Sequence, residues 1–464
     1  MRFLNAGSLL LIGGIVGACG SPTATNPSTG SSISPDSQLV VLREAYVYGL
    51  PLVLMDITRR QMTDPSNKAL YSPVNQFRHN NAFPDASFRN VVRPNADTYY
   101  SISWLDLSGG PVKLSLPATN GRYYMMPLMD AWSNVFAAPG TRTTGNGAVD
   151  LLIKGPGWNG AVPAGVQEIA APTNTVWIIG RIQVNSREDG KATVVPLQNQ
   201  IRLTPFTKQA ITHKPSPPAP IGDPNALLER MPVDSFFTYL NELMLKNPPP
   251  AADSPIIRRL TTVGIVPGKA FQRPTLPTTF YATLDSIPHT VFNAIRQSKT
   301  SSASLVNGWN MGTLVIGTYG TDYTSRAGVA VWGLGANLRE DAIYPSCNVD
   351  QQGQPLDGNQ PYVIHFPKGG APPAQAFWSL TLYDQDGYFV NNPINRYAIG
   401  DRSQLRPNAD GSIDIYVQQR DPGGVKTTNW LPAPPSHFNL LMRVYWPSSA
   451  MLQGNYIPPP VVKQ

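Results

Sequence analysis

The chain has 464 residues, of which 47 are proline and only 14% are charged. So many prolines divide a chain into short segments, which excludes a helical bundle. The net charge is +7, but no run of Lys or Arg is longer than two residues, as in Arg59-Arg60. No nucleic-acid module is present, so this diffuse positive charge favours an anionic envelope surface over nucleic-acid binding.

The N-terminus predicts export and lipid anchoring. A basic start precedes an apolar run over residues 9–16, which is too short to cross a bilayer and is typical of a signal peptide. Small residues then lead to Cys19, so we expect residues 1–18 to be removed and Cys19 to carry the lipid. A plain secretory signal with an incidental cysteine is the alternative. Because Gly20 gives no acidic retention signal, the outer membrane or its periplasmic face is the expected location.

Hydrophobic periodicity indicates the fold class. Two regions contain short segments rich in Val, Ile, Tyr and Trp, separated by turn residues about every eight to twelve positions, which is typical of antiparallel sandwiches. Between these regions, apolar residues around Phe236 and Leu240 recur at helical spacing. The sequence therefore predicts a mainly β protein with α-helices, in which two antiparallel jelly-roll-like β-sandwiches are joined by a helical middle section. The expected order is signal peptide (1–18), lipidated tether (19–35), N-terminal helical segment (36–65), first β-sandwich (66–223), helical linking section (224–345), second β-sandwich (346–450) and loose tail (451–464).

The two strand-rich regions resemble each other. When residues 122–136 are laid on residues 376–390 without a gap, four pairs match: Tyr123 with Phe377, Tyr124 with Trp378, Leu128 with Leu382, and Asp130 with Asp384. Side chains alternate across a strand, so each set falls on one face. The simplest interpretation is two sandwiches of one design. The alternative is that apolar strands of unrelated sheets look alike.

Several motifs resemble the paired domain-of-unknown-function families numbered 1254, at the N-terminal side, and 1214, at the C-terminal side. The N-terminal motifs are Arg93–Ser101, Trp104–Leu107, Gly121–Tyr124, Met129–Phe136 and Gly140–Arg142. The C-terminal motifs are Ala376–Asp384, Asn395–Tyr397, Asp410–Ser412 and Asn429–Pro432. Together they cover most of the chain after residue 40. The resemblance implies two jelly-roll-like sandwiches around a helical middle, and it implies no particular reaction.

Familiar cofactor and metal motifs are missing from the sequence. The spaced glycines of residues 155–160 are followed by Pro163 rather than a helix, which favours a turn over a dinucleotide site. The five histidines lie far apart, so we expect neither a cofactor nor a metal, although folding could assemble a site. Cys347 has no histidine near it in sequence, and we interpret it as a buried structural cysteine rather than a nucleophile.

Polar and aromatic residues at strand ends and in adjoining loops are the candidates for catalysis or ligand binding. Carboxylates beside tyrosines and arginines suit acid–base work, and aromatic faces suit sugars or apolar rings. The alternative is that Asp and Asn cap turns, aromatic residues fill cores and Arg pairs with Asp. The candidates are Asn95, Asp97, Tyr99, Tyr100, Asp130, Trp132 and Arg142 in the first sandwich, and Trp378, Tyr383, Asp384, Asn395, Arg396 and Trp430 in the second.

Three functions fit these features. The first is a cell-envelope lipoprotein that binds a small ligand or glycan at a sandwich end or in the cleft between domains. The second is a metal-independent envelope hydrolase or lyase that uses Asp97 or Asp130 with a tyrosine or arginine partner. The third is a structural or assembly lipoprotein. The expected partners are the membrane, through the lipid anchor, and a small ligand; nucleic acid is not expected, and homo-oligomerisation stays open.

Overall fold

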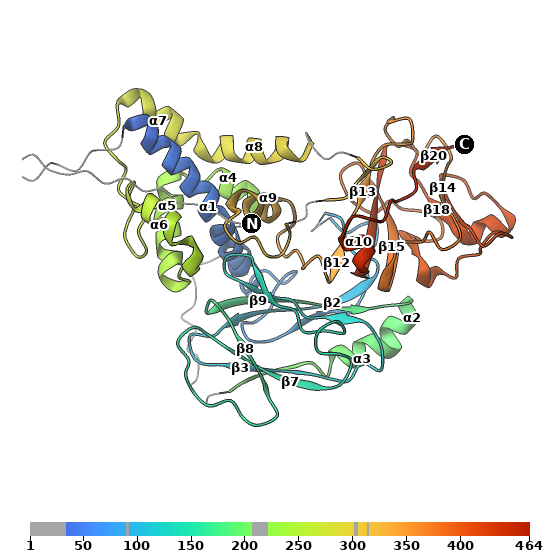
Figure 1. The fold of residues 1–464 in the computed structure, drawn as a ribbon, viewed down its shortest axis with the longest axis horizontal. Helices are drawn as coiled ribbons and strands as arrows, with labels where there is room; N and C mark the ends of the chain where they lie inside the picture. Colours follow the sequence, from blue (N-terminus) through green and yellow to red (C-terminus); the bar gives the residue numbers. More distant parts are fainter. Residues whose placement is uncertain (1–33, 90–91, 207–220, 301–304, 313–314) are drawn as a thin grey trace, which may run out of the picture.

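The computed structural model describes residues 34–89, 92–206, 221–300, 305–312 and 315–464. Figure 1 shows helices grouped around the blue N-terminal helix, a first sandwich in cyan to green, and a second in orange to red. The prediction of two sandwiches joined by helices is therefore confirmed. Cys19 and the signal peptide lie outside the described residues. No helix within the described ranges combines the length and apolar composition that a bilayer crossing requires.

The helical part is built around α1 (Pro35–Met62), which begins with Pro35 after the side-chain cap of Ser34. Buried residues lie on all sides of α1, as expected for a helix enclosed by others. The helices that pack on it come from the linking section: α4 (Pro224–Glu229), α5 (Val233–Lys246), α6 (Ser254–Thr261), α7 (Thr278–Asp285), α8 (Ile287–Thr300) and α9 (Tyr323–Gly333). A single 3₁₀ turn, η2 (Ala251–Asp253), precedes α6. Two segments that are distant in sequence thus share one apolar core.

The first sandwich packs a six-stranded sheet A against a four-stranded sheet B. Sheet A has the order β1-β2-β9-β5-β6, with β4 also paired to β9: β1 (Arg78–Asn80), β2 (Thr98–Asp106), β4 (Tyr124–Met125), β5 (Leu128–Asp130), β6 (Val135–Ala137) and β9 (Thr175–Gln183). Sheet B has the order β10-β3-β7-β8: β3 (Val112–Leu116), β7 (Val149–Lys154), β8 (Gln167–Ala170) and β10 (Arg202–Pro205). Three helical turns connect β9 to β10: α2 (Arg187–Asp189), η1 (Gly190–Val194) and α3 (Val195–Gln198).

The second sandwich packs a six-stranded sheet C against a four-stranded sheet D. Sheet C has the order β11-β13-β19-β15-β16, with β12 also paired to β19: β11 (Trp309–Asn310), β12 (Ala342–Ile343), β13 (Ser346–Cys347), β15 (Ala374–Asp384), β16 (Ala398–Gly400) and β19 (Phe438–Pro447). Sheet D has the order β18-β17-β14-β20: β14 (Tyr362–Phe366), β17 (Ile413–Gln418), β18 (Trp430–Pro432) and β20 (Val461–Lys463). The short helices are η3 (Asp401–Ser403), η4 (Gly424–Asn429) and α10 (Ser449–Leu452).

The tail that the sequence predicts to be loose is ordered. Strand β20 pairs antiparallel with β14, and α10 precedes it, so residues 451–464 complete sheet D. Three prolines at residues 458–460 favoured a loose segment, but prolines are tolerated directly before an edge strand because no ladder hydrogen bond is needed there.

The two sandwiches have the same connectivity. In the first sandwich, β3 pairs antiparallel with β7, and β7 pairs parallel with β8. In the second, β14 pairs antiparallel with β17, and β17 pairs parallel with β18. The long central strands β9 and β19 run antiparallel to β5 and β15, which are themselves joined to β6 and β16. The likeness between residues 122–136 and 376–390 therefore marks structurally equivalent strands.

Sheets A and C are covered on both faces. Their inner faces pack on sheets B and D and contain Tyr124 and Leu128 in one sandwich and Trp378 in the other. Part of the outer face of sheet A packs on α1 through Met55. Its remainder meets the outer face of sheet C in an aromatic contact made by Tyr123, Met125, Ala342, Phe377 and Tyr445. We call this contact region the junction; polar side chains on these outer faces are buried there.

Candidate functional site

One arginine occupies the middle of each central strand. Arg181 of β9 lies opposite Met125, and Arg443 of β19 lies opposite Ser379. Met125 and Ser379 are matched in the internal alignment, so the two arginines hold equivalent positions in the repeat. Their exposed fractions are only 8% and 3%. Because sheets A and C meet through their outer faces, both positive charges are buried at the junction.

Arg443 is held entirely by neutral groups. Its Nη1 donates to Oγ1 of Thr381 at 2.6 Å, and its Nη2 donates to the hydroxyl of Tyr383 at 2.6 Å. The same Nη2 donates to the carbonyl oxygens of Arg93 and Pro94 in the other sandwich, at 3.1 and 3.2 Å. Arg443 thus ties the segment before β2 to sheet C.

Arg181 is less completely bound. It donates from Nη1 to Oδ1 of Asn337 at 2.5 Å and to the carbonyl oxygen of Ile179 at 3.2 Å, and from Nη2 to that of Gly335 at 3.5 Å. Its Nε is buried and has no hydrogen-bond partner in the described part of the chain. An unmet buried donor is costly, which makes this atom a point where a ligand acceptor would be stabilising.

The buried carboxylates of the junction are already paired with other arginines. Asp97 forms an ion pair with Arg402 and also accepts a hydrogen bond from Oγ of Ser379 at 2.7 Å. Asp341 accepts a hydrogen bond from Nε of Arg142 at 2.7 Å. Among the described residues, the ion pairs of the junction therefore leave Arg181 and Arg443 without a carboxylate partner.

Two asparagines orient three tyrosine hydroxyls at the junction. Oδ1 of Asn95 accepts hydrogen bonds from the backbone N–H groups of Asp97 and Thr98, which fixes the orientation of the amide. Its Nδ2 therefore donates to the hydroxyls of Tyr100 and Tyr445, at 3.2 and 2.8 Å. Oδ1 of Asn337 accepts from Arg181, so its Nδ2 donates to the hydroxyl of Tyr344. All three phenolic oxygens therefore accept hydrogen bonds from amides.

The three phenolic protons have no acceptor among the described residues, because Tyr100, Tyr344 and Tyr445 donate in none of the hydrogen bonds found there. Arg181 lies close enough to interact electrostatically with all three hydroxyls. The junction thus combines an excess of hydrogen-bond donors with an excess of positive charge. Such a site suits an oxyanion, which is purely an acceptor.

The positive charge also separates the acidities of these tyrosines. Burial raises the pKa of Tyr100, but the charges of Arg181 and Arg443, together with hydrogen bonding from Arg181 and Asn95, hold it below its ordinary value of 10.0. Burial raises the pKa of Tyr344 to about 12, although the same arginines oppose the rise. Burial also raises the pKa of Tyr445 well above its ordinary value. Tyr100 is therefore the most acidic of the three phenols.

Backbone strain lies at the edge of the same junction. Arg93 has φ of 54°, and its carbonyl accepts from Arg443. Trp446, next to Tyr445, has φ of 48°. Bulky residues rarely occupy this left-handed region, and such strain clusters at sites where function requires a fixed geometry.

Four of the predicted candidates lie at the junction. Asn95, Asp97, Tyr100 and Tyr383 all make hydrogen bonds that join the two sandwiches or orient groups there. Arg142 lies at its margin, where it pairs with Asp341. Their nearness reflects the packing of sheet A on sheet C rather than the end of one sandwich.

Asp130 and Asp384 lie in equivalent turns, away from the junction hydroxyls. Oδ1 of Asp130 accepts the backbone N–H groups of Trp132 and Asn134, and Oδ1 of Asp384 accepts those of residues two and four positions later. Each is a turn-capping arrangement. Burial raises the pKa of Asp130 to about 6 against the opposing hydrogen bonds from Asn134.

The remaining candidates are dispersed. Tyr99 and Trp378 fill the two sandwich cores. Trp132 belongs to the helical core and donates from Nε1 to the carbonyl oxygens of residues 247 and 248. Arg396 donates to the carbonyl oxygen of Trp430 at 2.7 Å and so ties down η4, while Asn395 adopts a left-handed turn conformation with φ of 49°. The structure does not bring these residues together.

Sequence reasoning missed the residues that define the junction: Arg181, Arg443, Asn337, Tyr344 and Tyr445. One signal was present for the arginines, because each is a single charge inside an otherwise apolar strand. A charge at such a position is costly to bury without a reason, and both occur at the same place in the repeat. No comparable pattern marks Asn337 or Tyr344, which lie in the segment between α9 and β13.

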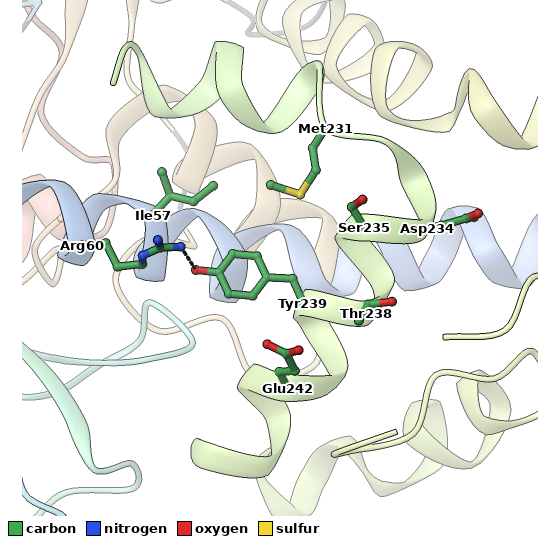
Figure 2. Close-up of a pocket in the computed structure, with 8 residues that line it drawn as sticks. All are labelled: Ile57, Arg60, Met231, Asp234, Ser235, Thr238, Tyr239 and Glu242. Atoms are coloured by element: carbon green, nitrogen blue, oxygen red, sulfur yellow. Dashed lines mark hydrogen bonds between the residues drawn. The ribbon is translucent and has the colours of Figure 1, made fainter. Parts of the chain in front are cut away.

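A separate groove of about 530 Å³ lies between α1 and α5 (Figure 2). The hydroxyl of Tyr239 points toward α1, where it donates to Asp56 and accepts from Nη1 of Arg60 at 3.4 Å. Asp234 forms an ion pair with Arg273 at 3.0 Å. The groove is open, and the side chains of Tyr239 and Asp234 are engaged by other groups of the protein. The full lining is Ile57, Arg60, Met231, Asp234, Ser235, Thr238, Tyr239 and Glu242.

Cys347 is buried in the core of the second sandwich, with 1% of its surface exposed. Burial raises the pKa of its thiol to about 12, so the thiol stays protonated near neutral pH. Within the described ranges, no three or more His, Cys, Asp or Glu side chains gather in a way that would hold a metal ion.

Comparison with solved structures shows the fold. The VPA0106 protein from Vibrio parahaemolyticus has a TM-score of 0.68 and 24% identity, and the alignment covers 92% of this chain and 100% of that protein. An uncharacterized protein from Burkholderia cenocepacia gives a TM-score of 0.45 at 12% identity, covering 92% and 93% of the two chains. No curated protein sequence matches this chain.

Comparison with family models confirms the expected resemblance. Residues 74–205 match the family described as "Protein of unknown function (DUF1254)", and residues 341–449 match "Protein of unknown function (DUF1214)". The first match spans most of sheets A and B, and the second covers the core strands of sheets C and D. The chain therefore carries a region that matches the DUF1254 family, followed by a region that matches the DUF1214 family, in the order that the sequence motifs predicted.

Proposed function

We propose that this protein binds a small organic anion at the junction, with Arg181 and Arg443 supplying the positive charge. The observation that supports this most directly is the pair of buried guanidinium groups whose partners are all neutral. Both nearby carboxylates form their ion pairs with other arginines, and they act on Arg443 and Arg181 only from a longer distance, Asp97 on Arg443 and Asp341 on Arg181. A buried charge without a direct ion-pair partner is expensive for a fold to maintain, and an anionic ligand would supply that partner.

Hydrogen-bond chemistry narrows the ligand class. Among the described residues, the phenolic protons of Tyr100, Tyr344 and Tyr445 and Nε of Arg181 have no hydrogen-bond acceptor. A carboxylate or phosphate group presents acceptor oxygens in several directions and matches this set of donors. The neighbouring rings of Tyr123, Phe377 and Trp446 favour an apolar or aromatic body attached to the anion.

The same site is a poor fit for the acid–base chemistry expected of Asp97. Its two carboxylate oxygens are engaged by Arg402 and Ser379, and its exposed fraction is 1%. A carboxylate held in this way positions the two sandwiches and is not available to take a proton from a substrate. Ligand binding is therefore favoured over a mechanism that uses Asp97 as a base.

We also propose that the protein is a cell-envelope lipoprotein anchored through Cys19. Support comes from the signal-like N-terminus and from the small residues before Cys19. The measurement is membrane fractionation of cells that express Cys19→Ser, which we expect in the soluble fraction. Retention of this variant with the membranes would contradict the lipid anchor.

Ligand binding is tested by thermal unfolding of the purified full chain at neutral pH with a panel of anions. The panel contains acetate, benzoate, phosphate and phenyl phosphate at millimolar concentration, with chloride at matched ionic strength. We expect at least one organic anion to raise Tm, since a ligand that binds only the folded state stabilises it by about 2.7 kcal/mol at a hundredfold excess over Kd. Benzoate and phenyl phosphate distinguish a carboxylate site from a phosphate site.

Two variants locate the binding. Arg181→Gln should reduce the affinity at least tenfold, and Tyr344→Phe should reduce it less while preserving the fold. The matched control is Arg296→Gln, because Arg296 forms its ion pair with Glu229 in the helical part, far from the junction. If no anion raises Tm, or if Arg181→Gln and Arg296→Gln bind equally well, the proposal is wrong.

A further inference from the structure

We infer that Tyr100 is the proton-exchanging group of the junction, and that anion binding there is coupled to uptake of one proton by its phenolate. This inference rests on the proposed anion site and deepens it. At a pH above the pKa of Tyr100, its phenolate in the empty site partly balances the two arginines. An entering anion takes over that role, and Tyr100 then gains a proton from solvent and donates it to the anion in a hydrogen bond.

The geometry around Tyr100 stabilises a phenolate. The guanidinium of Arg181 lies over its ring, with 5.0 Å between the carbon Cζ and the ring centroid. Its oxygen accepts Nδ2 of Asn95 at 3.2 Å, and no acceptor for its own proton occurs among the described residues. The amide is locked by two backbone hydrogen bonds, so it must donate to Tyr100 whatever the protonation state.

The charged and titratable groups that face Tyr100 come from several elements. Arg181 lies on β9 beside it, Arg443 and Tyr445 lie on β19, and Tyr344 lies between β12 and β13. Both arginines favour the phenolate, while the phenols are neutral near physiological pH because their own pKa values are raised. Within the described residues, the two carboxylates of the junction are paired with Arg402 and Arg142. Tyr100 is therefore the group that responds to a change in pH.

Tyr100 can exchange protons with solvent, because its side chain and those of Asn95 and Tyr344 remain partly exposed. Tyr445 and Tyr383, which belong to the same hydrogen-bonded region, are fully buried. The partly exposed side chains thus mark the side of the junction from which a ligand would enter. Proton exchange and ligand entry would use the same side.

The first experiment needs no ligand. Ultraviolet difference absorbance of tyrosinate is recorded while the full chain is titrated from pH 6 to alkaline pH. We expect one of the 19 tyrosines to ionise below its ordinary pKa of 10.0. Tyr100→Phe should abolish this step, whereas Tyr344→Phe should retain it, since the pKa of Tyr344 is raised to about 12. An early step that survives in Tyr100→Phe would overturn the inference.

The second experiment measures the coupling, with benzoate or phenyl phosphate as the probe. Calorimetric titration in two buffers of different ionisation enthalpy counts the protons taken up. Above the pKa of Tyr100 we expect uptake approaching one proton and an affinity that falls about tenfold per pH unit, because only the protonated fraction binds. In Tyr100→Phe both the uptake and this pH dependence should disappear.

The two proposals fail in different ways. If an anion binds through Arg181 without proton uptake, the site is real and the role of Tyr100 is wrong. If no anion in the panel binds but the early tyrosinate step is found, Tyr100 is a phenolate next to arginines and the ligand proposal is wrong. Loss of folding in Tyr100→Phe is checked by circular dichroism. Asn95→Asp is a second variant: it replaces the amide donor that faces Tyr100 and Tyr445 with a carboxylate, and the added negative charge should raise the pKa of Tyr100.

Discussion

The two sandwiches share one design but use it differently. Their strand order, their parallel pair and their Asp-capped turn are equivalent, and each has an arginine on its central strand, β9 or β19. Arg443 makes four hydrogen bonds, two of them to the opposite sandwich, whereas Nε of Arg181 has no hydrogen-bond partner in the part of the chain that the structure describes. The repeat therefore supplies two charges, of which one holds the sandwiches together and the other remains available.

The largest expected loss of stability comes from substituting two glycines, one in each sandwich, that lie against the junction strands. A Cβ on Gly400 would lie 2.2 Å from the carbonyl oxygen of Trp378, and one on Gly140 would lie 2.5 Å from that of Tyr124. Backbone atoms cannot yield cheaply, so Gly400→Ala and Gly140→Ala should each lower the free energy of unfolding by about 4 kcal/mol or more. Denaturant unfolding measures this.

The control for these substitutions is Gly328→Ala in α9, where the added methyl group has open space around it. It should be neutral or slightly stabilising, by roughly 0.5–1 kcal/mol, because alanine is the better helix former. Destabilisation in only one of the two sandwiches would show that the close approach of these strands is not a common requirement of the repeat.

The next largest expected effect is a difference in stability between variants of the two arginines. Arg443→Gln should lower the free energy of unfolding by about 3 kcal/mol, because buried carbonyl groups and two hydroxyls lose their donor. Arg181→Gln should cost only about 1 kcal/mol while impairing anion binding. Denaturant midpoints of both variants, each measured with and without ligand, check this division. Equal losses of stability would contradict the difference between the two positions.

The smallest of these effects concerns the capped turns and depends on pH. Burial raises the pKa of Asp130 to about 6 from its ordinary 3.8, so the folded state binds the proton more tightly than the unfolded state. The stabilisation is fully present below pH 3.8 and is lost as pH rises through about 6. The free energy of unfolding of Asp130→Asn, taken relative to that of wild type, should therefore rise by roughly 2–3 kcal/mol between acidic and neutral pH.

The matched control is Asp384→Asn, which makes the same chemical change in the partly exposed turn of the second sandwich. Unfolding free energies of wild type and both variants are measured across this pH range. An equal pH dependence in the two variants would contradict an origin in the burial of Asp130.

Much of the fold followed from local patterns. Alternation predicted that Tyr124 and Leu128 share one face of a strand, and both lie in the sandwich core. Helical spacing around Phe236 and Leu240 predicted α5, whose apolar face is buried. The loose tail was wrong because the pairing of β20 with β14 joins residues about a hundred positions apart, which no local pattern records.

The candidate site was only partly predicted. Asn95, Asp97, Tyr100 and Tyr383 were selected as polar or aromatic residues at strand ends, and all four lie at the junction. Asp130 and Trp132 satisfied the same criterion but lie in a turn and in the helical core. Strand-end position alone cannot separate the two groups, because it does not say which face of the sheet another domain will cover.

The sequence by itself determined the order of elements, the repeated sandwich and the family, because alternation, turn residues and motifs are local properties of the chain. Only the tertiary structure decided that the outer faces of sheets A and C cover each other. That packing buries Arg181 and Arg443 and pairs Asp97 and Asp341 with other arginines. The physical reason is that burial and charge pairing depend on which surfaces meet, and residues far apart in the chain settle that.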